Sequence, residues 1–268
     1  MIFLELITSR SNPLIADTAK LKDKKYRDEK REFLFEGIKL TREAIHSKVE
    51  ITKIFLTEKC AAKYPDLAKD SRAVLISDSV CSKISENSAP EGIICRANYI
   101  QDLHGEYDEK EDLTPYTPGL FLWTVQDPGN LGTIARTSAA FGRMALILTE
   151  DCADIYNQKT VRASMGAMFR IRTRRAKKPI EAIEDMKKKG YTVYATALTD
   201  KAITLQEAKQ AMEGRFDKSC FILGNEGHGL SEEVIESCSQ TVIIPMEKDA
   251  ESLNVASAAT VILWEGYR

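Results

Sequence analysis

The chain has 268 residues, of which 43% are hydrophobic and 29% are charged, and it is long enough to bury the cores of two modest domains. This composition excludes fibrous and wholly disordered proteins. The formal net charge is -2, from 38 Lys and Arg against 40 Asp and Glu, and taken as a total it argues against a nucleic-acid partner.

Targeting and metal-binding signals are missing from the sequence. The first residues, MIFLELITSRSNP, lack the basic start, long apolar run and cleavage site of a signal peptide, and no segment of about 18 residues runs without charge. The six cysteines are widely spaced with no C-x-x-C pair, and there are three histidines. We therefore expect a cytoplasmic protein with reduced thiols, no membrane span and no metal.

An acidic segment divides the chain. Residues 102–112, DLHGEYDEKED, hold six acids and one lysine and precede TPYTPG, a composition typical of a linker or exposed loop. Before it, β-rich runs (EFLFEG, ITKIFLT, RAVLIS, EGIICRA) alternate with helical patterns (IKLTREAIHSK, DSVCSKISE). We predict a small α/β domain over residues 1–104, an acidic linker over 105–118 and a second domain over 119–268.

The second domain shows the pattern of a parallel sheet. Its nearly continuous apolar runs (LFLWTV, MALILT, TVYATAL, CFILG, TVIIP) are separated by helical stretches, one of which begins at Pro179 and ends at Gly190. Strands that are apolar on both faces and alternate with helices indicate a doubly wound α/β fold. Ligands of such folds bind at the carboxyl ends of the strands, so candidate functional residues are expected in the loops there.

Two of these loops are rich in glycine. The first, VQDPGNLGTIARTSAAFG, places Asn130 and Arg136 on either side of a strand-to-helix turn, and it fits a ligand site and a simple tight turn equally well. Its G-x-x-G spacing differs from the G-x-G-x-x-G of dinucleotide-binding enzymes. The second loop, FILGNEGHGLSEE, holds three glycines around Glu226, a density that suggests a backbone wrapped closely around a ligand. We interpret His228 as an exposed loop residue.

The chain finishes with the segment VIIPMEKDAESLNVASAATVILWEGYR. Ser252 or Asn254 could simply cap the final helix, which is the usual role of such residues. That helix is apolar nearly all round and contains small residues, so we expect it to be buried or to form an interface.

Local charge differs from the total. The stretch from Ile155 to Ile180 has eight bases and no acid, and we interpret it as a contact for a polyanion such as a phosphate backbone. A second cluster, KLKDKKYRDEKR, has seven bases against three acids, a balance that a solvated helix face often shows.

Taken together, DPGNLGTIARTSAAFG, FILGNEGHGL and VIIPM with ESLNVASAATVILWE resemble the signatures of the SpoU/TrmH family of RNA ribose 2′-O-methyltransferases, within the larger SPOUT group. The N-terminal stretch from ITSRSNP to GIKLTREAI looks like the substrate-binding domain that many members carry. The resemblance implies S-adenosylmethionine as cofactor, a C-terminal trefoil knot and a homodimer with the last helix at the interface.

The resemblance also implies roles for individual residues. Catalytic roles fall to Arg136, Asn130, Glu226, Ser252 and Asn254. The cofactor pocket would be formed by Leu223, Gly224, Asn225, Gly227, Ile244, Met246 and Leu253. A guanidinium is too basic to be a good general base, so we expect Arg136 to bind phosphate and stabilise a developing alkoxide. Many members have a serine directly after the Leu-Asn-Val triplet, whereas this chain has Ala256, with Ser257 one position later.

RNA contacts are expected at the basic segments and near the N-terminus, at Arg10, Asn12, Lys24, Lys25, Arg27, Arg162, Arg170, Arg172, Arg174 and Arg175. The leading hypothesis is an S-adenosylmethionine-dependent methyltransferase of ribosomal RNA. Alternatives are a transfer-RNA ribose methyltransferase and a non-catalytic RNA-binding protein on the same fold. A metabolite-binding α/β enzyme would leave the basic stretches unexplained.

Overall fold

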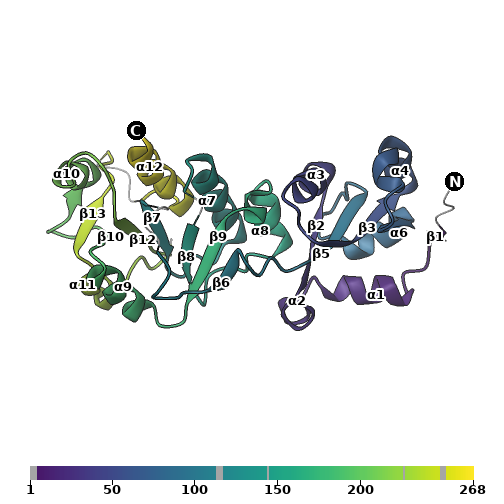
Figure 1. Cartoon of the computed structure of the whole chain (residues 1–268), viewed down its shortest axis with the longest axis horizontal. Coiled ribbons are helices and arrows are strands. Elements are labelled where there is room, and N and C mark those ends of the chain that lie inside the picture. The colour runs from purple at the N-terminus through teal and green to yellow at the C-terminus, as the bar shows by residue number, and fades with distance from the viewer. Residues whose placement is uncertain (1–4, 113–116, 144, 226, 248–251) are drawn as a thin grey trace. The chain divides into compact units, whose positions relative to one another are not determined.

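The computed structural model describes residues 5–112, 117–143, 145–225, 227–247 and 252–268. The chain divides into two compact units (Figure 1). Unit 1 comprises residues up to Ile100 together with Asp154–Phe169, and unit 2 comprises Gln101–Ala153 and Arg170–Arg268.

Unit 1 is built around a mixed sheet with the strand order β1-β4-β3-β5-β2. Its strands are β1 (Leu6–Ile7), β2 (Glu32–Glu36), β3 (Ile51–Thr57), β4 (Ala73–Ile76) and β5 (Ile93–Asn98). Its helices are α1 (Pro13–Lys20), α2 (Lys24–Lys30), α3 (Ile38–His46), α4 (Glu58–Lys63), α5 (Pro65–Ala68), α6 (Asp78–Ile84) and α8 (Gln158–Ala163), with a 3-10 turn at Ala167–Phe169. The β-rich runs of the sequence correctly predicted β2 to β5.

Each face of this sheet is covered by different helices. Leu34, Phe55 and Ile76 pack under α1 and α6 in one apolar cluster. The alternating residues Phe33 and Phe35 point to the opposite face, because successive side chains of a strand point to opposite sides.

On that opposite face, the segment from Asp154 to Phe169 supplies aromatic partners. The ring of Tyr156 lies 4.8 Å from that of Phe33, and the ring of Phe169 lies 5.2 Å from that of Phe35. The sequence-based division put this segment in the second domain. Instead, its aromatic side chains complete the core of unit 1, so unit 1 is discontinuous in sequence.

Unit 2 contains an eight-stranded, fully parallel sheet in the order β11-β13-β10-β12-β7-β8-β9-β6. Its strands are β6 (His104–Glu106), β7 (Gly119–Leu122), β8 (Ala145–Thr149), β9 (Arg172–Ala176), β10 (Thr192–Thr196), β11 (Ile203–Thr204), β12 (Ser219–Leu223) and β13 (Gln240–Ile243). Its helices are α7 (Pro128–Ala140), α9 (Pro179–Lys188), α10 (Leu205–Ala211), α11 (Glu232–Ser237) and α12 (Val255–Tyr267).

Helices cover both faces of this sheet, which confirms the predicted α/β class. Helices α7 and α12 lie side by side on one face, and α9 and α11 lie on the other (Figure 1). The central strands β8 and β12 are buried along their whole length, as expected for strands covered on both sides. The trefoil knot that the resemblance implies stays a prediction.

The acidic segment was expected to be a linker, but part of it belongs to the sheet. Strand β6 pairs with β9, and Glu111 forms an ion pair with Arg174. Glu111 of the acidic segment therefore neutralises an arginine of β9. Among the described residues, no helix is both long and apolar enough to span a bilayer.

Candidate active site

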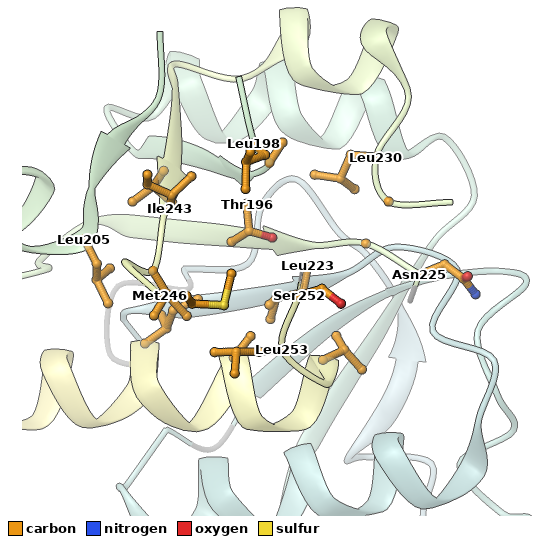
Figure 2. A pocket seen from close by; sticks show the side chains of 18 of the residues that line it. Thr196, Leu198, Leu205, Leu223, Asn225, Leu230, Ile243, Met246, Ser252 and Leu253 are labelled. Carbon is orange, nitrogen blue, oxygen red and sulfur yellow. The ribbon is translucent and has the colours of Figure 1, made fainter. Parts of the chain in front are cut away.

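Strands β10, β12 and β13 end at the same edge of the parallel sheet, and the segments that follow them enclose a cavity of about 380 Å³ (Figure 2). The start of α12 closes the cavity from below in this view. The cavity is lined by Thr196, Ala197, Leu198, Leu205, Leu223, Gly224, Asn225, Gly229, Leu230, Ile235, Val242, Ile243, Ile244, Met246, Ser252, Leu253, Val255, Ala258 and Ile262.

The cavity is mostly apolar. Its described lining carries no formally charged side chain, and Thr196, Asn225 and Ser252 supply the polar side chains. A volume of a few hundred cubic ångströms with apolar walls and a few polar groups suits a small organic cofactor. The site is therefore shaped for an aromatic base or an alkyl chain rather than for a metal ion or a phosphate.

The pocket contains most of the residues that the sequence assigned to the cofactor. Leu223, Gly224, Asn225, Ile244, Met246 and Leu253 all line it, together with Ser252. Gly227 is outside the lining, but its N–H donates to Asn225 Oδ1 at 2.7 Å. Thr196 and Leu198 also line the cavity but were not predicted. They stand at the end of an apolar strand of a parallel sheet, and that position could have identified them.

Gly224 allows the backbone to turn tightly at the end of β12. A Cβ atom at this position would lie 2.7 Å from the backbone carbon and oxygen of Gly229. Backbone atoms cannot swing aside as a flexible side chain can, so any larger residue at position 224 would push Gly229 away. The close approach of the Gly229 backbone is therefore the structural reason for a glycine at position 224 of the motif FILGNEGHGL.

The N-termini of α7 and α12 meet through a pair of asparagines. Asp127 caps α7 by accepting from Asn130 N at 2.8 Å, and Asn254 caps α12 by accepting from Ala256 N and Ser257 N. The Asn254 amide then donates to Asn130 Oδ1 at 3.1 Å. Asn254 therefore both caps a helix and links two of the sequence motifs.

Arg136 lies apart from these residues. It is exposed on α7, six residues after Asn130, which corresponds to about 9 Å along a helix and to a different face. It does not line the cavity of its own chain. Glu226, the remaining residue with an expected catalytic role, lies outside the described residues.

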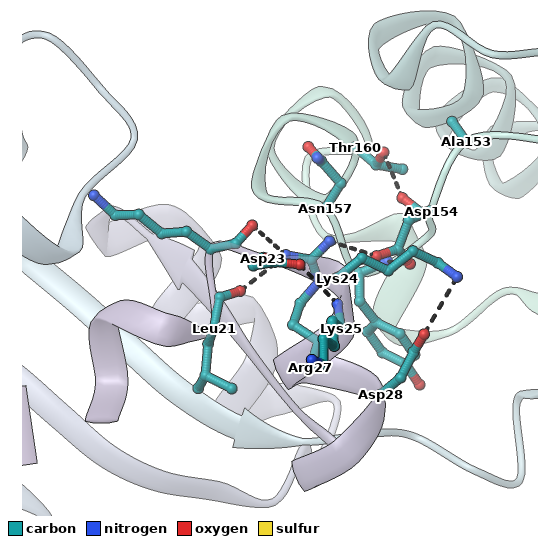
Figure 3. Close-up of polar contacts among 12 residues, drawn as sticks. Leu21, Asp23, Lys24, Lys25, Arg27, Asp28, Ala153, Asp154, Asn157 and Thr160 are labelled. Atoms are coloured by element: carbon teal, nitrogen blue, oxygen red, sulfur yellow. Dashed lines mark hydrogen bonds and ion pairs between the residues drawn. The ribbon is translucent and has the colours of Figure 1, made fainter. Parts of the chain in front are cut away.

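Arg27 is part of the interior of unit 1 (Figure 3). Its side chain is 3% exposed, pairs with Asp154 at 2.7 Å and donates to the carbonyls of Leu21 and Lys22. All of this hydrogen bonding is internal, because the guanidinium joins α2 to the 154–169 segment within one unit. This corrects the expectation of an RNA contact at Arg27.

The arginines of β9 also form ion pairs and hydrogen bonds with other residues of unit 2. Arg174 pairs with Glu111 at 2.6 Å, and Arg172 reaches the same carboxylate at 3.5 Å. Arg175 donates to the carbonyls of Thr149, Glu150 and Ala153. Arg174 and Arg175 therefore have partners within the fold, whereas the side chain of Arg172 is 41% exposed. An RNA contact at these arginines stays a prediction.

Other expected RNA contacts remain on the surface. The side chains of Arg10, Lys24, Lys25, Arg162 and Arg170 are exposed. Asn12 is partly buried, and its side chain caps α1 by accepting from Leu14 N at 3.0 Å.

Comparison with known proteins places this geometry in a family. Residues 119–264 match the model of the SpoU rRNA methylase family, and residues 12–95 match that of an MRM3-like substrate binding domain. The matched residues include all three loops around the cavity. The chain belongs to the SpoU rRNA methylase family.

SpoU relatives resemble this chain over nearly its whole length. RlmP of Bacillus subtilis (strain 168), a 23S rRNA guanosine 2′-O-methyltransferase, is 32% identical over 97% of this chain and 98% of its own. A crystal structure of an S-adenosylmethionine-bound rRNA methyltransferase from Sinorhizobium meliloti is 29% identical, covers 98% of this chain and 97% of its own, and has a TM-score of 0.80. A second structure, of an RNA 2′-O ribose methyltransferase, has a TM-score of 0.81 at 28% identity over 98% of both chains.

The cysteines of this chain are free, and five of the six are buried. All six cysteines are free thiols, and burial raises the pKa of Cys152, which lies between the ends of β7 and β8. In the part of the chain that the structure describes, no group of three or more His, Cys, Asp or Glu side chains could hold a metal ion.

Proposed function

We propose that this protein transfers a methyl group from S-adenosylmethionine to the 2′-hydroxyl of a ribose in ribosomal RNA. The observation that carries the proposal is the uncharged cavity built from the three loops that follow β10, β12 and β13, in a chain of the SpoU family. RlmP, a relative of almost the same extent, is named for this reaction on 23S rRNA.

The residues of the cavity fit the cofactor. Leu205, Leu223 and Ile262 offer apolar walls for an adenine ring, and Asn225 and Ser252 offer hydrogen bonds at the rim. When bound there, S-adenosylmethionine supplies a methyl group that its sulfonium makes ready to transfer. The protein then has to orient the ribose hydroxyl and manage its proton.

Asn130 and Asn254 are suited to orient the ribose. Their side chains are held together at 3.1 Å at the meeting point of two helix N-termini, close to Ser252 in sequence. Helix N-termini present N–H groups and favour negative charge, so this corner can stabilise oxygen as it loses its proton.

Arg136 supplies positive charge for the same purpose. Guanidinium groups are poor general bases, so we propose that Arg136 stabilises the developing alkoxide or an adjacent phosphate. Because it does not line the cavity of its own chain, we propose that it serves the site of a second copy in a homodimer.

The surface of unit 2 offers an interface for that dimer. Trp264 and Tyr267 of α12 are 47% and 61% exposed, and their rings cluster with Phe141 at the end of α7. Large aromatic side chains exposed together are typical of protein interfaces.

The exposed cations of unit 1 are suited to hold the RNA. Arg10, Lys24, Lys25 and Arg162 are exposed on the unit that contains the residues matching a substrate binding domain. Their contacts would be with phosphates, so affinity should fall steeply with salt. We expect the enzyme to work in the cytoplasm, where its six free thiols remain reduced.

Methyl transfer tests the proposal. Labelled S-adenosylmethionine should label ribosomal RNA in preference to transfer RNA, and Arg136→Ala should lower kcat about a hundredfold while leaving cofactor affinity intact. Labelling of transfer RNA alone would show that the substrate is transfer RNA and would contradict the proposed ribosomal RNA substrate. Binding of RNA without any transfer would identify a non-catalytic binding protein.

Mixing two inactive variants tests the shared site. Arg136→Ala leaves the cavity intact, whereas Gly224→Ala disrupts the cavity and leaves Arg136 in place. If Arg136 acts on the partner's site, mixed dimers hold one complete site, and the mixture should regain about a quarter of wild-type activity. No recovery after verified subunit exchange would place Arg136 in its own chain's site.

A further inference from the structure

Thr124, just beyond β7, has an uncommon backbone conformation. Its φ of 53° lies in the left-handed region, which β-branched residues rarely adopt because the Cβ substituents crowd the backbone. Such strain persists only where surrounding contacts hold it in place, and it is often found at functional sites. Thr124 lies outside the cavity and matched none of the sequence motifs, so its conformation needs a separate explanation.

Thr124 is held from both sides by the neighbouring strands. Its N–H donates to Thr149 Oγ1 at the end of β8, at 2.9 Å. Its carbonyl accepts from Asn225 Nδ2 in the loop after β12, at 3.0 Å. The adjacent N–H of Trp123 donates to Leu223 O at 2.8 Å. The left-handed turn thus connects β8 to the loop that lines the cavity.

Asn225 links Thr124 to two glycines that follow it in the chain, Gly227 and Gly229. Its amide nitrogen donates to the carbonyl of Thr124, and its Oδ1 accepts from Gly227 N at 2.7 Å. Figure 2 shows Asn225 at the edge of the cavity. The carbonyl of Asn225 also accepts from Gly229 N at 2.9 Å. Any shift of Thr124 would be transmitted to the cavity rim.

Thr149 holds Thr124 from the side of β8. Its side chain is 4% exposed, and its hydroxyl accepts from Thr124 while donating to Asp151 Oδ1 at 2.5 Å, which uses the hydroxyl as both acceptor and donor. Arg175 of β9 donates to the carbonyls of Thr149, Glu150 and Ala153, in the segment that follows β8. The connection therefore crosses four neighbouring strands at their carboxyl ends, from β9 through β8 and β7 to β12.

We propose that Thr149 is a positioning residue for the cofactor site, acting through the backbone of Thr124 on Asn225 and, through Asn225, on Gly227 and Gly229. The proposal rests on the proposed function, because it takes the cavity to be the cofactor site. It also gives Arg175 a supporting role, because its guanidinium holds the segment that begins at Thr149.

Substitution of the hydroxyl tests the proposal. Thr149→Val keeps the shape but leaves the Thr124 N–H without its acceptor, so affinity for S-adenosylmethionine, measured by calorimetry without RNA, should fall about tenfold. In steady-state assays KM for the cofactor should rise while KM for RNA stays unchanged. Thr149→Ser keeps both hydrogen bonds and should restore affinity to within about twofold of wild type.

A matched control separates positioning from general destabilisation. Thr173 is a buried threonine of β9 in the same sheet, and its hydroxyl bonds to His104 instead of the cavity loops. Thr173→Val should lower the melting temperature without changing cofactor affinity. Equal cofactor affinities for Thr149→Val and wild type, or a Thr149→Ser variant as weak as Thr149→Val, would overturn the proposal. Failure of the wild-type protein to bind S-adenosylmethionine would instead overturn the proposed function.

Discussion

At the scale of single residues, Asn254 has two roles, and a substitution by alanine would remove both at once. Its Oδ1 caps α12, and its Nδ2 donates to Asn130. The sequence presented capping and function as alternatives at this position, whereas the structure gives Asn254 a cap and a contact with a second motif at once.

Asn254→Asp separates these two roles. A carboxylate still caps the helix and favours its positive end, but it cannot donate to Asn130. We expect unchanged thermal stability and a lower kcat for Asn254→Asp, measured by melting and by methyl transfer. Asn254→Ala should lose activity and also about 1 kcal/mol of stability. A fully active Asn254→Asp enzyme would remove the asparagine pair from the mechanism.

Gly224 provides a second residue-level prediction. Because its Cβ would meet the Gly229 backbone at 2.7 Å, Gly224→Ala should abolish detectable cofactor binding in calorimetry. Gly227→Ala is the control, since the nearest atom of the described residues to its Cβ would be the Asn225 side-chain oxygen, at 3.3 Å. We expect a much smaller loss there, and equal losses would show that loop flexibility rather than the tight approach matters.

The sequence predicted the residues that line the cavity better than it predicted the partners of the charged side chains. The pocket residues from Leu223 to Leu253 could be assigned because the motifs that hold them resemble those of a known family, and the glycines because they follow a strand of the sheet. Arg27 and Arg175 could not, because a count of charges along the sequence does not reveal a carboxylate or carbonyl that comes from another segment.

At the scale of elements, the apolar strands were predictable and β9 was not. Its sequence RTRRA has no apolar run, and it forms a strand because Glu111 and main-chain carbonyls satisfy its arginines while Thr173 and Ala176 are buried. The place of the 154–169 segment in unit 1 was also unpredictable, since it depends on Tyr156 and Phe169 meeting Phe33 and Phe35.

The buried pair between Arg27 and Asp154 should be a major support for that segment. Asp154→Ala leaves a buried guanidinium without its partner and should lower the free energy of unfolding by about 3 kcal/mol in denaturant titrations. Lys24→Ala removes the exposed pair with Asp28 and should cost less than about 1 kcal/mol. If the two variants were equally stable, the buried pair would contribute no more than a surface pair.

Acid should weaken the same unit through α1. Hydrogen bonds from Lys30 and then Arg96 lower the pKa of Asp17 below its ordinary value of 3.8. A carboxyl with a lower pKa in the folded state stabilises the fold above pH 3.8, and this contribution disappears as pH falls through the lowered value. Asp17→Asn should therefore be less stable than wild type at pH 7, with the difference shrinking below about pH 4. A difference that stayed constant down to pH 2 would contradict this origin.

At the scale of the whole molecule, the net charge of -2 conceals how the cations are used. Some, such as Arg27, Arg174 and Arg175, stabilise the fold. Others, such as Arg10, Lys25 and Arg162, are exposed on unit 1. A near-neutral total is therefore compatible with an RNA-binding surface, because the acids that balance it lie partly in internal ion pairs.

The overall class and the α/β order followed from hydrophobic patterning alone. The division into units did not, because unit 1 takes residues from the middle of the chain to complete its core. Patterning detects which segments form strands, but it does not detect which sheet an intervening aromatic segment will cover.

The chemical position of the transferred methyl tests the central claim most directly. Alkali cleaves RNA by attack of the 2′-oxygen on the neighbouring phosphate, and methylation of that oxygen blocks cleavage at one linkage. After labelling of ribosomal RNA with methyl-labelled S-adenosylmethionine, complete alkaline hydrolysis should leave the label in resistant dinucleotides. Label recovered in mononucleotides would show methylation of a base and contradict the assignment.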